Sequence, residues 1–492
     1  MKVSIESFIS PVLGVKHQAL DARLTDPVKL IRDLGLSGEP CVLLDSAGGS
    51  PSLSEYSFLA WEPRLSLTVS GERAVLGSGA GMMEVVTDNP FQLLRDLLTA
   101  LAPEGIAAVA ASAGVPVAGG AFGLLSYDAG RFIERLPSRA ADDLGLPALD
   151  FIFPRRLICF DHRSGKAHLF FEDAAPAAVA EAVEALERQP GEGAPPDGQL
   201  PGRHTHDLSS VTRSNMTREE FEDMVRRARD YIRAGDIFQA NLSQRLELEY
   251  TGDSLELYRA LRSVNPSPFS GFLELGGYQV ISSSPERLVQ LRGRKAQTRP
   301  IAGTRGRGAD MAEDDSLTAE LNLDPKERAE HIMLVDLERN DMGRVCDYGS
   351  VRVDELMVNE AYSHVIHIVS NIRGELHHAR DAVDLVKAMF PGGTITGCPK
   401  VHCMEIIDEL EPVRRGPYTG SFGYIGYCGN MDMNIIIRTL VRQEEKVYAQ
   451  AGAGIVADSD PEREYHETLR KAEAMVRAVE LATAAAASHG DG

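Results

Sequence analysis

Three shortages in the sequence exclude whole classes of protein. The 492 residues contain six cysteines, none of them in a CxxC pair, so neither zinc-ligand spacing nor a disulfide framework is present. No window holds about 18 uninterrupted apolar residues, which argues against a membrane-spanning helix. The first residues also lack the long apolar run of a signal peptide. We therefore expect a protein of the cytoplasm with reduced thiols.

Positively charged residues are also scarce. The 51 lysines and arginines are outnumbered by 72 aspartates and glutamates, which gives a formal net charge of −21. Nucleic acids and anionic membrane surfaces bind clustered cations, so neither is an expected partner. A small anionic substrate is still compatible with this composition if a few arginines or a divalent cation line its pocket.

Residues 189–215 divide the chain. This segment is rich in proline, glycine and polar residues and has no periodicity, which is typical of a linker. Directly after it, Thr217 and Glu220 form a capping box ahead of apolar residues at helical spacing, which predicts an amphipathic helix. We therefore predict an N-terminal region over 1–188, a linker over 189–215 and a second region over 216–485.

Strand-like runs are frequent in both regions. In the first region they lie at 41–46, 56–61, 64–69, 156–162 and 167–173, beside a helical stretch at 90–102. In the second region they lie at 245–250, 271–284, 364–372, 420–427, 433–440 and 446–452. Strands and helices do not alternate regularly, so the pattern favours an α+β fold of antiparallel sheets, with helices outside, over a doubly wound parallel sheet.

Two segments place carboxylates in the same pattern. Residues 324–331 read DPKERAEH and residues 460–467 read DPEREYHE, so each begins with an aspartate able to cap a helix and a proline suited to its first position. Each segment then carries two glutamates three residues apart on one helical face. Facing pairs would suit Mg²⁺, whereas separate pairs would only complement the helix dipoles, and spacing alone favours the second interpretation. The glutamates are Glu327, Glu330, Glu464 and Glu467.

A series of longer strings adds the missing evidence. In order they are GDIFQANLSQR (235–245), SSSPERL (282–288), TRPIAGTRGRG (298–308), ERAEHIMLVDLERND (327–341), FPGGTITGCPK (390–400), GNMDMNIIIRT (429–439) and AGAGIVADSDPEREYHET (451–468). Together they closely resemble the chorismate-binding enzymes: component I of anthranilate synthase and of aminodeoxychorismate synthase, isochorismate synthase and salicylate synthase. The first region resembles the N-terminal part of the two aminating members through LLDS (43–46), EYSFLAW (55–61) and GGAFGLLSYDAGRF (119–132).

This resemblance implies roles for individual residues. It assigns the four glutamates to Mg²⁺, which would bind the ring carboxylate of chorismate. It makes Glu286 the general acid that protonates the departing C4 hydroxyl, and His367 an active-site histidine. Arg438 matches an arginine that pairs with the other substrate carboxylate, and the glycine-rich turn 451–454 lets backbone approach the ligand. The implied substrate-binding residues are Gln239, Ala302, Thr304, Thr396, Tyr418, Arg438, Gly452 and Gly454.

The nucleophile and the product follow from two of these positions. Members that add water carry a lysine base where this chain has Gln239, and an amide is not a useful base, so ammonia from a separate glutamine amidotransferase subunit is expected. Many aminodeoxychorismate synthases carry a nucleophilic lysine where this chain has Ala302, so this residue favours anthranilate. The strings at 240–245, 390–397 and 411–432 resemble the aminodeoxychorismate branch instead. The sequence favours 4-amino-4-deoxychorismate as product, with anthranilate and pyruvate as the alternative.

The first region also carries a candidate tryptophan site, because several of its residues fall where family members contact tryptophan. The tryptophan would be either a feedback inhibitor or a constitutive structural ligand, and a packing role for the aromatic residues explains them equally well. The candidate residues are Ser46, Tyr56, Ser57, Pro268, Phe269 and Ser270.

Overall fold

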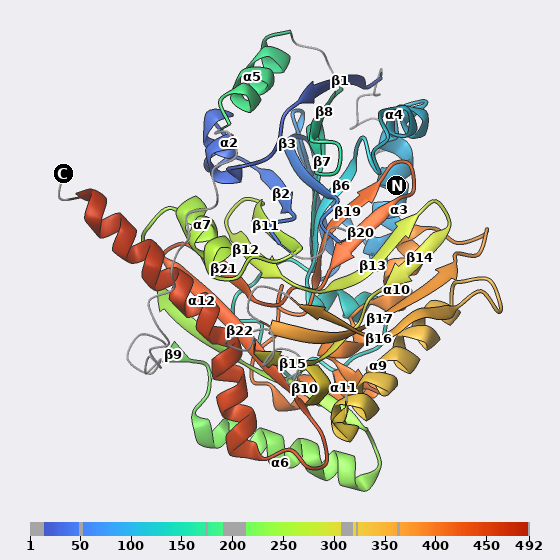
Figure 1. The fold of residues 1–492 in the computed structure, drawn as a ribbon, viewed down its shortest axis with the longest axis vertical. Coiled ribbons are helices and arrows are strands. Elements are labelled where there is room, and N and C mark those ends of the chain that lie inside the picture. The colour runs from blue at the N-terminus through green and yellow to red at the C-terminus, as the bar shows by residue number, and fades with distance from the viewer. Residues whose placement is uncertain are drawn as a thin grey trace.

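The computed structural model describes residues 14–48, 53–172, 176–189, 213–306, 318–320, 323–361 and 365–490. Within these ranges, antiparallel pairings join the strands of both halves of the chain into one large curled sheet, and helices cover its outside (Figure 1). The predicted α+β class is therefore confirmed. Most of the predicted linker, residues 190–212, lies outside the described residues, and the proposed domain division stays a prediction.

The N-terminal half supplies two long paired strands with shorter ones around them. Its elements are β1 (Lys16–Asp21), α2 (Pro27–Asp33), β2 (Cys41–Asp45), β3 (Tyr56–Ser70), β4 (Arg73–Ser78), β5 (Gly81–Val86), α3 (Pro90–Leu101), α4 (Ile106–Ala113), β6 (Gly120–Leu125), the 3-10 helix η1 (Tyr127–Phe132), β7 (Leu149–Asp161), β8 (Lys166–Phe171) and α5 (Pro176–Glu187). The two runs predicted at 56–61 and 64–69 form the single strand β3, which pairs with β7 through a register shift near Pro63. Such a shift bends a strand without ending it.

The second half begins with the helix that its capping box predicts. Its elements are β9 (Arg213–Ser214), α6 (Arg218–Ala234), β10 (Gln239–Glu249), α7 (Ser254–Val264), β11 (Phe269–Glu274), β12 (Gln279–Ser284), β13 (Arg287–Arg292), β14 (Lys295–Thr298), β15 (Ile301–Gly306), α9 (Pro325–Gly343), β16 (Arg352–Ala361), β17 (Val365–Glu375), α10 (Ala382–Met389), the 3-10 helix η3 (Gly393–Ile395), β18 (Gly397–Cys398), α11 (Lys400–Leu410), β19 (Ser421–Gly426), β20 (Met431–Asn434), β21 (Thr439–Gln443), β22 (Lys446–Ile455) and α12 (Pro461–Gly490). The Thr217 hydroxyl accepts from the Glu220 backbone and the Glu220 side chain accepts from the Thr217 backbone, which confirms the capping box.

Two sequence predictions about this half are wrong in detail. The run at 433–440 is not one strand, because the backbone leaves β20 after Asn434 and returns to the sheet in β21 at Thr439. Arg438 lies in this interruption with a φ of 51°, in the left-handed region that costs most residues strain. The glycine-rich residues 451–454 form part of strand β22 and not a turn.

Strands from the two halves pair directly, which places the N-terminal elements beside the C-terminal ones (Figure 1). β2 pairs with β11, and β6 pairs with β19 with Gly123 opposite Gly423. A Cβ added to Gly123 would lie 2.1 Å from the Asp150 carbonyl oxygen, and one added to Gly423 would lie 2.0 Å from the Asp432 carbonyl oxygen. Only glycine permits this approach of neighbouring backbones. None of the described helices is long and apolar enough to cross a membrane.

Candidate active site

Strands β10 and β22 form the floor of the site. Glycines in β22 let polar side chains of neighbouring elements lie close to the β22 backbone. Asn241 pairs with Gly454 in this ladder. A Cβ added to Gly452 would lie 2.4 Å from Asn241 Oδ1 and 2.8 Å from the Tyr418 hydroxyl oxygen. A Cβ added to Gly454 would lie 2.5 Å from Gln239 Nε2. Any larger residue at Gly452 or Gly454 would displace these side chains, because cores tolerate little added volume.

Helix α9 brings one of the predicted glutamates to this floor. The helix begins at Pro325 and the Glu327 N–H donates to Asp324 Oδ1 over 3.4 Å, as the Asp-Pro start predicts. One turn further, Glu330 Oε1 accepts a 3.0 Å hydrogen bond from Gln239 Nε2. The same oxygen lies 3.7 Å from the Cβ position of Gly454. Glu330 therefore reaches the edge of β22.

Helix α12 approaches the same strand from another side. It begins at Pro461, and Asp460 Oδ1 accepts from the Arg463 N–H over 3.0 Å. Lys471 Nζ lies 2.8 Å from Glu467 Oε1 and donates to the Gly452 carbonyl over 3.0 Å. Glu330 and Lys471 thus both reach the stretch of β22 between Gly452 and Gly454, from helices far apart in the sequence, and Lys471 is paired with Glu467.

The predicted glutamates are nevertheless not assembled into a metal centre. Within the described part of the chain, no three histidine, cysteine, aspartate or glutamate side chains lie close enough together to hold a metal ion. Glu464 is largely buried, and its backbone N–H donates to Asp460 within the first helical turn. The chemistry of the four side chains fits Mg²⁺, because carboxylate oxygens are the ligands that this cation prefers.

Glu286 is a buried acid at the start of β13. Its side chain is 5% exposed, and its Oε1 has no hydrogen-bond partner in the described ranges. Burial raises the pKa of this carboxyl to about 7, while the Thr394 hydroxyl, the Ile301 N–H and the positive charges of Arg438 and Lys471 act in the opposite direction. A carboxyl whose pKa is raised in this way can keep its proton near neutral pH, which suits a general acid.

His367 is buried on β17, opposite Thr304 of β15 in the backbone register. Burial and the charge of Arg438 together lower its pKa to about 4, while the Gly303 backbone acts in the opposite direction. The imidazole is therefore neutral at pH 7. Arg438 thus acts electrostatically on both Glu286 and His367, which places its charge beside both of them.

The remaining predicted residues lie around this group. Tyr418 is buried, and the guanidinium carbon of Arg415 lies 5.6 Å from the centre of its ring. The Thr396 hydroxyl donates to the Gly392 carbonyl, and the Thr396 carbonyl accepts from the Asn241 N–H over 2.8 Å. Ala302 and Thr304 belong to β15, which pairs with β17, but their side chains lie outside the described ones.

Three polar residues of this site were missed by the sequence interpretation. Lys471 lies one helical turn beyond Glu467, and Asn241 lies two residues beyond Gln239, on the same face of its strand. Thr394 lies in the turn before Thr396 and faces Glu286. Periodicity alone could have suggested Lys471 and Asn241, whereas the position of Thr394 depends on tertiary contacts.

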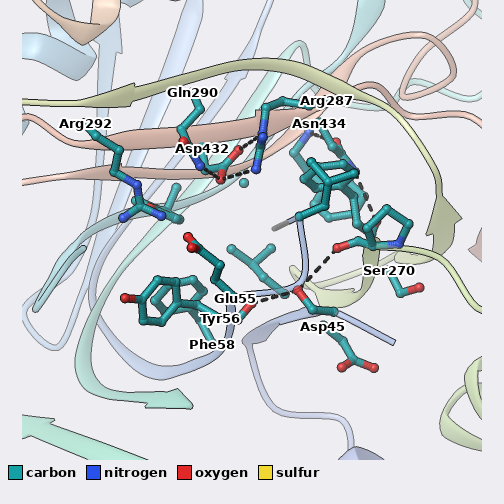
Figure 2. A pocket seen from close by; sticks show the side chains of 18 residues that line it. Asp45, Glu55, Tyr56, Phe58, Ser270, Arg287, Gln290, Arg292, Asp432 and Asn434 are labelled. Carbon is teal, nitrogen blue, oxygen red and sulfur yellow. Dashed lines mark hydrogen bonds and ion pairs between the residues drawn. The ribbon is translucent and has the colours of Figure 1, made fainter. Parts of the chain in front are cut away.

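A separate pocket of about 510 Å³, its open mouth included, lies between the two halves of the chain (Figure 2). Its walls include five residues of the candidate tryptophan site: Ser46, Tyr56, Pro268, Phe269 and Ser270. Arg292 lies over the Tyr56 ring, 5.5 Å from its centre, and Arg287 lies over the Phe269 ring at 4.9 Å. The pocket therefore combines aromatic surface with cations, which suits an aromatic ligand that carries a carboxylate.

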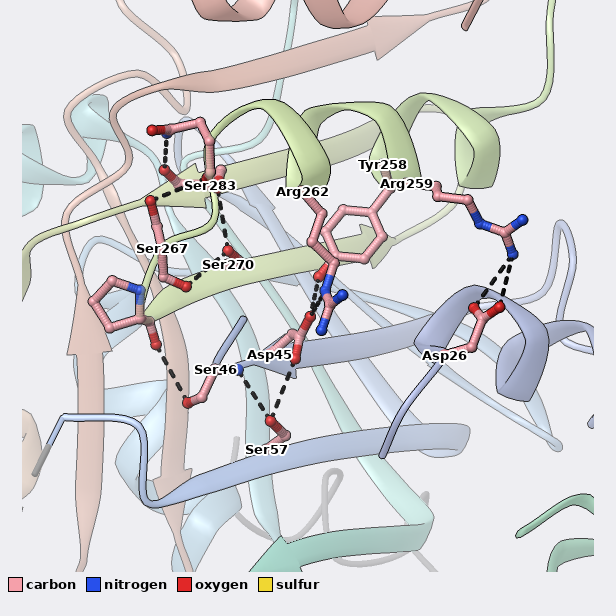
Figure 3. A network of polar contacts seen from close by, with 12 residues as sticks. Asp26, Asp45, Ser46, Ser57, Tyr258, Arg259, Arg262, Ser267, Ser270 and Ser283 are labelled. Atoms are coloured by element: carbon pink, nitrogen blue, oxygen red, sulfur yellow. Dashed lines mark hydrogen bonds and ion pairs between the residues drawn. The ribbon is translucent and has the colours of Figure 1, made fainter. Parts of the chain in front are cut away.

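Ser57, the sixth candidate residue, is buried behind the pocket wall and does not line it. Its hydroxyl accepts from the Ser46 N–H over 3.0 Å and lies 2.7 Å from His162 Nε2. Beside it, buried Asp45 accepts 2.7 Å hydrogen bonds from Tyr258 and from Arg262 Nε (Figure 3). This network fixes the strand end that presents Ser46 to the pocket.

The pocket and the candidate active site meet at one strand. Arg287 directly follows Glu286, and neighbouring residues at a strand start point to opposite sides. Arg287 lines the pocket and binds both carboxylate oxygens of Asp432, at 2.9 and 3.1 Å (Figure 2). Glu286 instead lies near Arg438 and Lys471. A ligand that moved Arg287 would therefore act on the residue next to the buried acid.

Comparison with known proteins identifies the family of the chain. The model of the chorismate binding enzyme family matches residues 39–477. Anthranilate synthase component 1 of Thermus thermophilus is 50% identical over 375 residues, which cover 75% of this chain and 79% of that protein. Aminodeoxychorismate synthase component 1 of Bacillus subtilis is 46% identical over 371 residues, 74% of this chain and 77% of that protein. Most of the other similar proteins are named anthranilate synthase component 1.

A solved structure agrees with this likeness. Anthranilate synthase component I of Streptococcus pneumoniae superimposes with a TM-score of 0.72 at 35% identity. The superposition covers 86% of this chain and 92% of that one.

Proposed function

Because the chain belongs to the chorismate-binding enzyme family, we propose that it is component I of an anthranilate synthase and converts chorismate and ammonia to anthranilate and pyruvate. One structural observation supports the chemistry most strongly: the buried acid Glu286 has an oxygen without a partner among the described residues and lies near the charges of Arg438 and Lys471. The product rests on the relatives, which support anthranilate better than the 4-amino-4-deoxychorismate that the sequence strings favoured. A cytoplasmic location stays a prediction.

In this proposal the protein residues bind the dianion and move one proton. Arg438 pairs with one carboxylate of chorismate as a planar bidentate donor, and Lys471 adds positive charge beside the other. Ammonia forms a bond to C2 of the ring while the C4 hydroxyl leaves as water with the proton of Glu286, and the ammonium formed at C2 loses a proton that replaces the one given by Glu286. The C2 hydrogen then leaves as a proton while the C3–O bond breaks, which makes the ring aromatic and releases enolpyruvate, and this takes up a proton to become pyruvate. Neutral His367 can donate or accept a hydrogen bond in this pocket without adding charge.

Mg²⁺ is part of the same proposal, with Glu327, Glu330, Glu464 and Glu467 as the side chains that would hold it. Glu330 lies beside Gly454 of β22, and Glu467 is paired with Lys471, which donates to the Gly452 carbonyl, so one glutamate from each helix lies near this strand. The cation would neutralise and orient the ring carboxylate of the substrate.

Gln239 supports ammonia as the nucleophile. Its amide nitrogen donates to Glu330, and an amide cannot take a proton from water at neutral pH. Ammonia needs no such base. We therefore propose a glutamine amidotransferase as the partner that supplies ammonia, in keeping with relatives that are named as component 1 of a larger enzyme.

Amination at C4 is the second candidate reaction. It is favoured by the string FPGGTITG at 390–397, which includes Thr396 and resembles the aminodeoxychorismate branch. It is also favoured by the 46% identity to the Bacillus subtilis aminodeoxychorismate synthase component 1. Ala302 argues against the covalent route to that product, because alanine offers no nucleophile for C2.

We expect the purified chain to form fluorescent anthranilate from chorismate, Mg²⁺ and an ammonium salt without any further enzyme. The products are separated by chromatography, with and without a pyridoxal-phosphate-dependent aminodeoxychorismate lyase. Reactions that lack ammonium serve as the control and should give no aminated product. If para-aminobenzoate appears only with the lyase and anthranilate is absent, C4 amination replaces the proposed reaction.

We also propose that the pocket of Figure 2 binds L-tryptophan, with the aromatic wall of Tyr56 against the indole ring. Tyr56→Ala is expected to weaken tryptophan binding about 2- to 13-fold, because such aromatic contacts contribute about 0.5–1.5 kcal/mol. Isothermal titration calorimetry measures the affinity. Tyr348→Ala, which truncates a fully exposed tyrosine, is the matched control and should bind like the wild type. Failure of the wild type to bind tryptophan at millimolar concentration contradicts the proposal.

A further inference from the structure

Helix α9 carries a second buried acid that the proposed reaction does not use. Glu338 lies two turns beyond Glu330, and its side chain is 4% exposed. Glu338 Oε2 lies 2.7 Å from Thr298 Oγ1, and the same hydroxyl oxygen lies 2.8 Å from the Leu288 carbonyl oxygen. Thr298 is completely buried at the end of β14. One hydroxyl therefore bridges a helix and a strand in the protein interior.

The number of hydrogens available for these two hydrogen bonds determines the protonation state of Glu338. The Thr298 hydroxyl has a single hydrogen, and the Leu288 carbonyl can only accept. Both short contacts are satisfied when Thr298 donates to Leu288 and Glu338, as the neutral acid, donates to Thr298. An ionised Glu338 would compete with Leu288 for the one hydrogen and leave a buried acceptor unsatisfied, which is costly.

The charges around Glu338 agree with a neutral acid. Burial, together with the charges of Glu286 and Asp341, raises its pKa to about 8, while Thr298 and Lys400 oppose this shift. The ammonium of Lys400 is already 2.6 Å from Asp341 and also donates to the Met389 carbonyl over 2.8 Å. Its charge is therefore largely compensated by Asp341.

The bridge reaches the catalytic acid on two sides. Leu288 lies two residues beyond Glu286 on β13, and Thr298 lies three residues before Ile301, whose N–H faces the Glu286 carboxyl. We propose that Glu338 is a positioning residue that, as a neutral acid, joins α9 to β13 through Thr298 and so holds Glu286 in its reactive position. This inference rests on the proposed function for the role of Glu286.

The inference predicts a steeper loss of activity at alkaline pH than one acid would cause. As the pH rises through about 7 and then about 8, Glu286 and Glu338 ionise in turn, so the proton donor and its bridge are lost together. The plot of log kcat/KM against pH should then fall with a slope of one from the loss of protonated Glu286, and in the wild type by about a further tenfold around pH 8, the loss also expected of Glu338→Leu. Glu338→Gln keeps a donor toward Thr298 but does not titrate, so its profile should fall with a slope of one and lack the further tenfold loss.

Matched variants separate the bridge from simple packing. Glu338→Gln and Thr298→Ser retain a hydrogen-bond donor at each end of the bridge and are expected to keep kcat within about twofold of the wild type. Glu338→Leu and Thr298→Val each remove a hydrogen bond and should lower kcat about tenfold, with little change in KM. Equal losses in Glu338→Gln and Glu338→Leu, or the same further tenfold loss around pH 8 in Glu338→Gln as in the wild type, would overturn the inference.

Infrared spectroscopy of the chain without substrate tests the bridge independently of any reaction. The difference spectrum between wild type and Glu338→Gln at pH 7 should contain the carbonyl stretch of a protonated carboxylic acid, and this band should disappear as the pH rises above about 8. A carboxylate band in its place would overturn the inference even in an active enzyme. A wild type that shows the acid band but does not consume chorismate would instead contradict the proposed function.

Discussion

Glu286→Gln is expected to lower turnover of chorismate about 10²- to 10⁴-fold, the usual contribution of a positioned general acid. Glutamine has nearly the same shape, so the buried side chain keeps its place beside Thr394 and Ile301. Its amide cannot transfer a proton to the departing hydroxyl at neutral pH. The substrate carboxylates can still bind Arg438 and Lys471 in this variant, so KM should change much less than kcat.

The pH dependence gives this prediction a sign. Because burial raises the pKa of Glu286 to about 7, the acid is protonated below that pH and loses its proton above it. Activity of the wild type should therefore fall toward alkaline pH, and the small residual activity of Glu286→Gln should lack this loss. Steady-state rates of chorismate consumption from pH 6 to 9 measure both effects.

Glu274→Gln is the matched control for Glu286→Gln. Glu274 is also buried, and burial raises the pKa of its carboxyl, but it lies on β11 and accepts from Gln279 over 2.9 Å. This variant should retain wild-type turnover. If Glu286→Gln keeps more than a tenth of the wild-type rate while Glu274→Gln is normal, Glu286 is not the proton donor.

Local sequence signals predicted much of the fold because they act within a few residues. The capping box at Thr217 and the Asp-Pro starts of α9 and α12 satisfy backbone N–H groups in one helical turn, so tertiary contacts are not needed to recognise them. The strand pattern failed where neighbours override propensity. β-branched residues predict strand from Asn434 to Thr439, but the backbone turns there and gives Arg438 a positive φ.

The candidate site was predictable in its residue types and less so in its arrangement. Resemblance named Glu286, His367 and Arg438, and the charge of Arg438 acts on the pKa values of both Glu286 and His367, which places it close to both. No sequence pattern indicated that Glu338 would meet Thr298, because these residues are 40 positions apart and their contact depends on how α9 packs against the sheet. The sequence motifs also do not determine which product is formed, because the two amination reactions differ in the ring carbon that ammonia attacks.

The second large effect concerns a buried ion pair beneath the site. Glu411 and Arg415 are 3% and 1% exposed, and Glu411 Oε1 lies 2.7 Å from Arg415 Nη2. The arginine also donates to the carbonyls of Ile395 and Asn241, at 3.0 and 2.6 Å. It therefore connects α11 with β10 and with the turn that carries the active-site threonines. The buried positive charge of Arg415 is stabilised in the protein interior by the carboxylate of Glu411.

Glu411→Gln is expected to lower the free energy of unfolding by about 3–5 kcal/mol, because it leaves the charge of Arg415 buried without a counterion. Urea unfolding followed by circular dichroism measures this loss. Glu184→Gln, which weakens an exposed pair with Arg188 on α5, is the control and should cost less than about 1 kcal/mol. Glu411→Gln combined with Arg415→Met removes the uncompensated charge, so the double variant should recover part of the stability lost by Glu411→Gln alone. A double variant less stable than Glu411→Gln would show that the arginine stabilises this region through its carbonyl contacts and not through the ion pair.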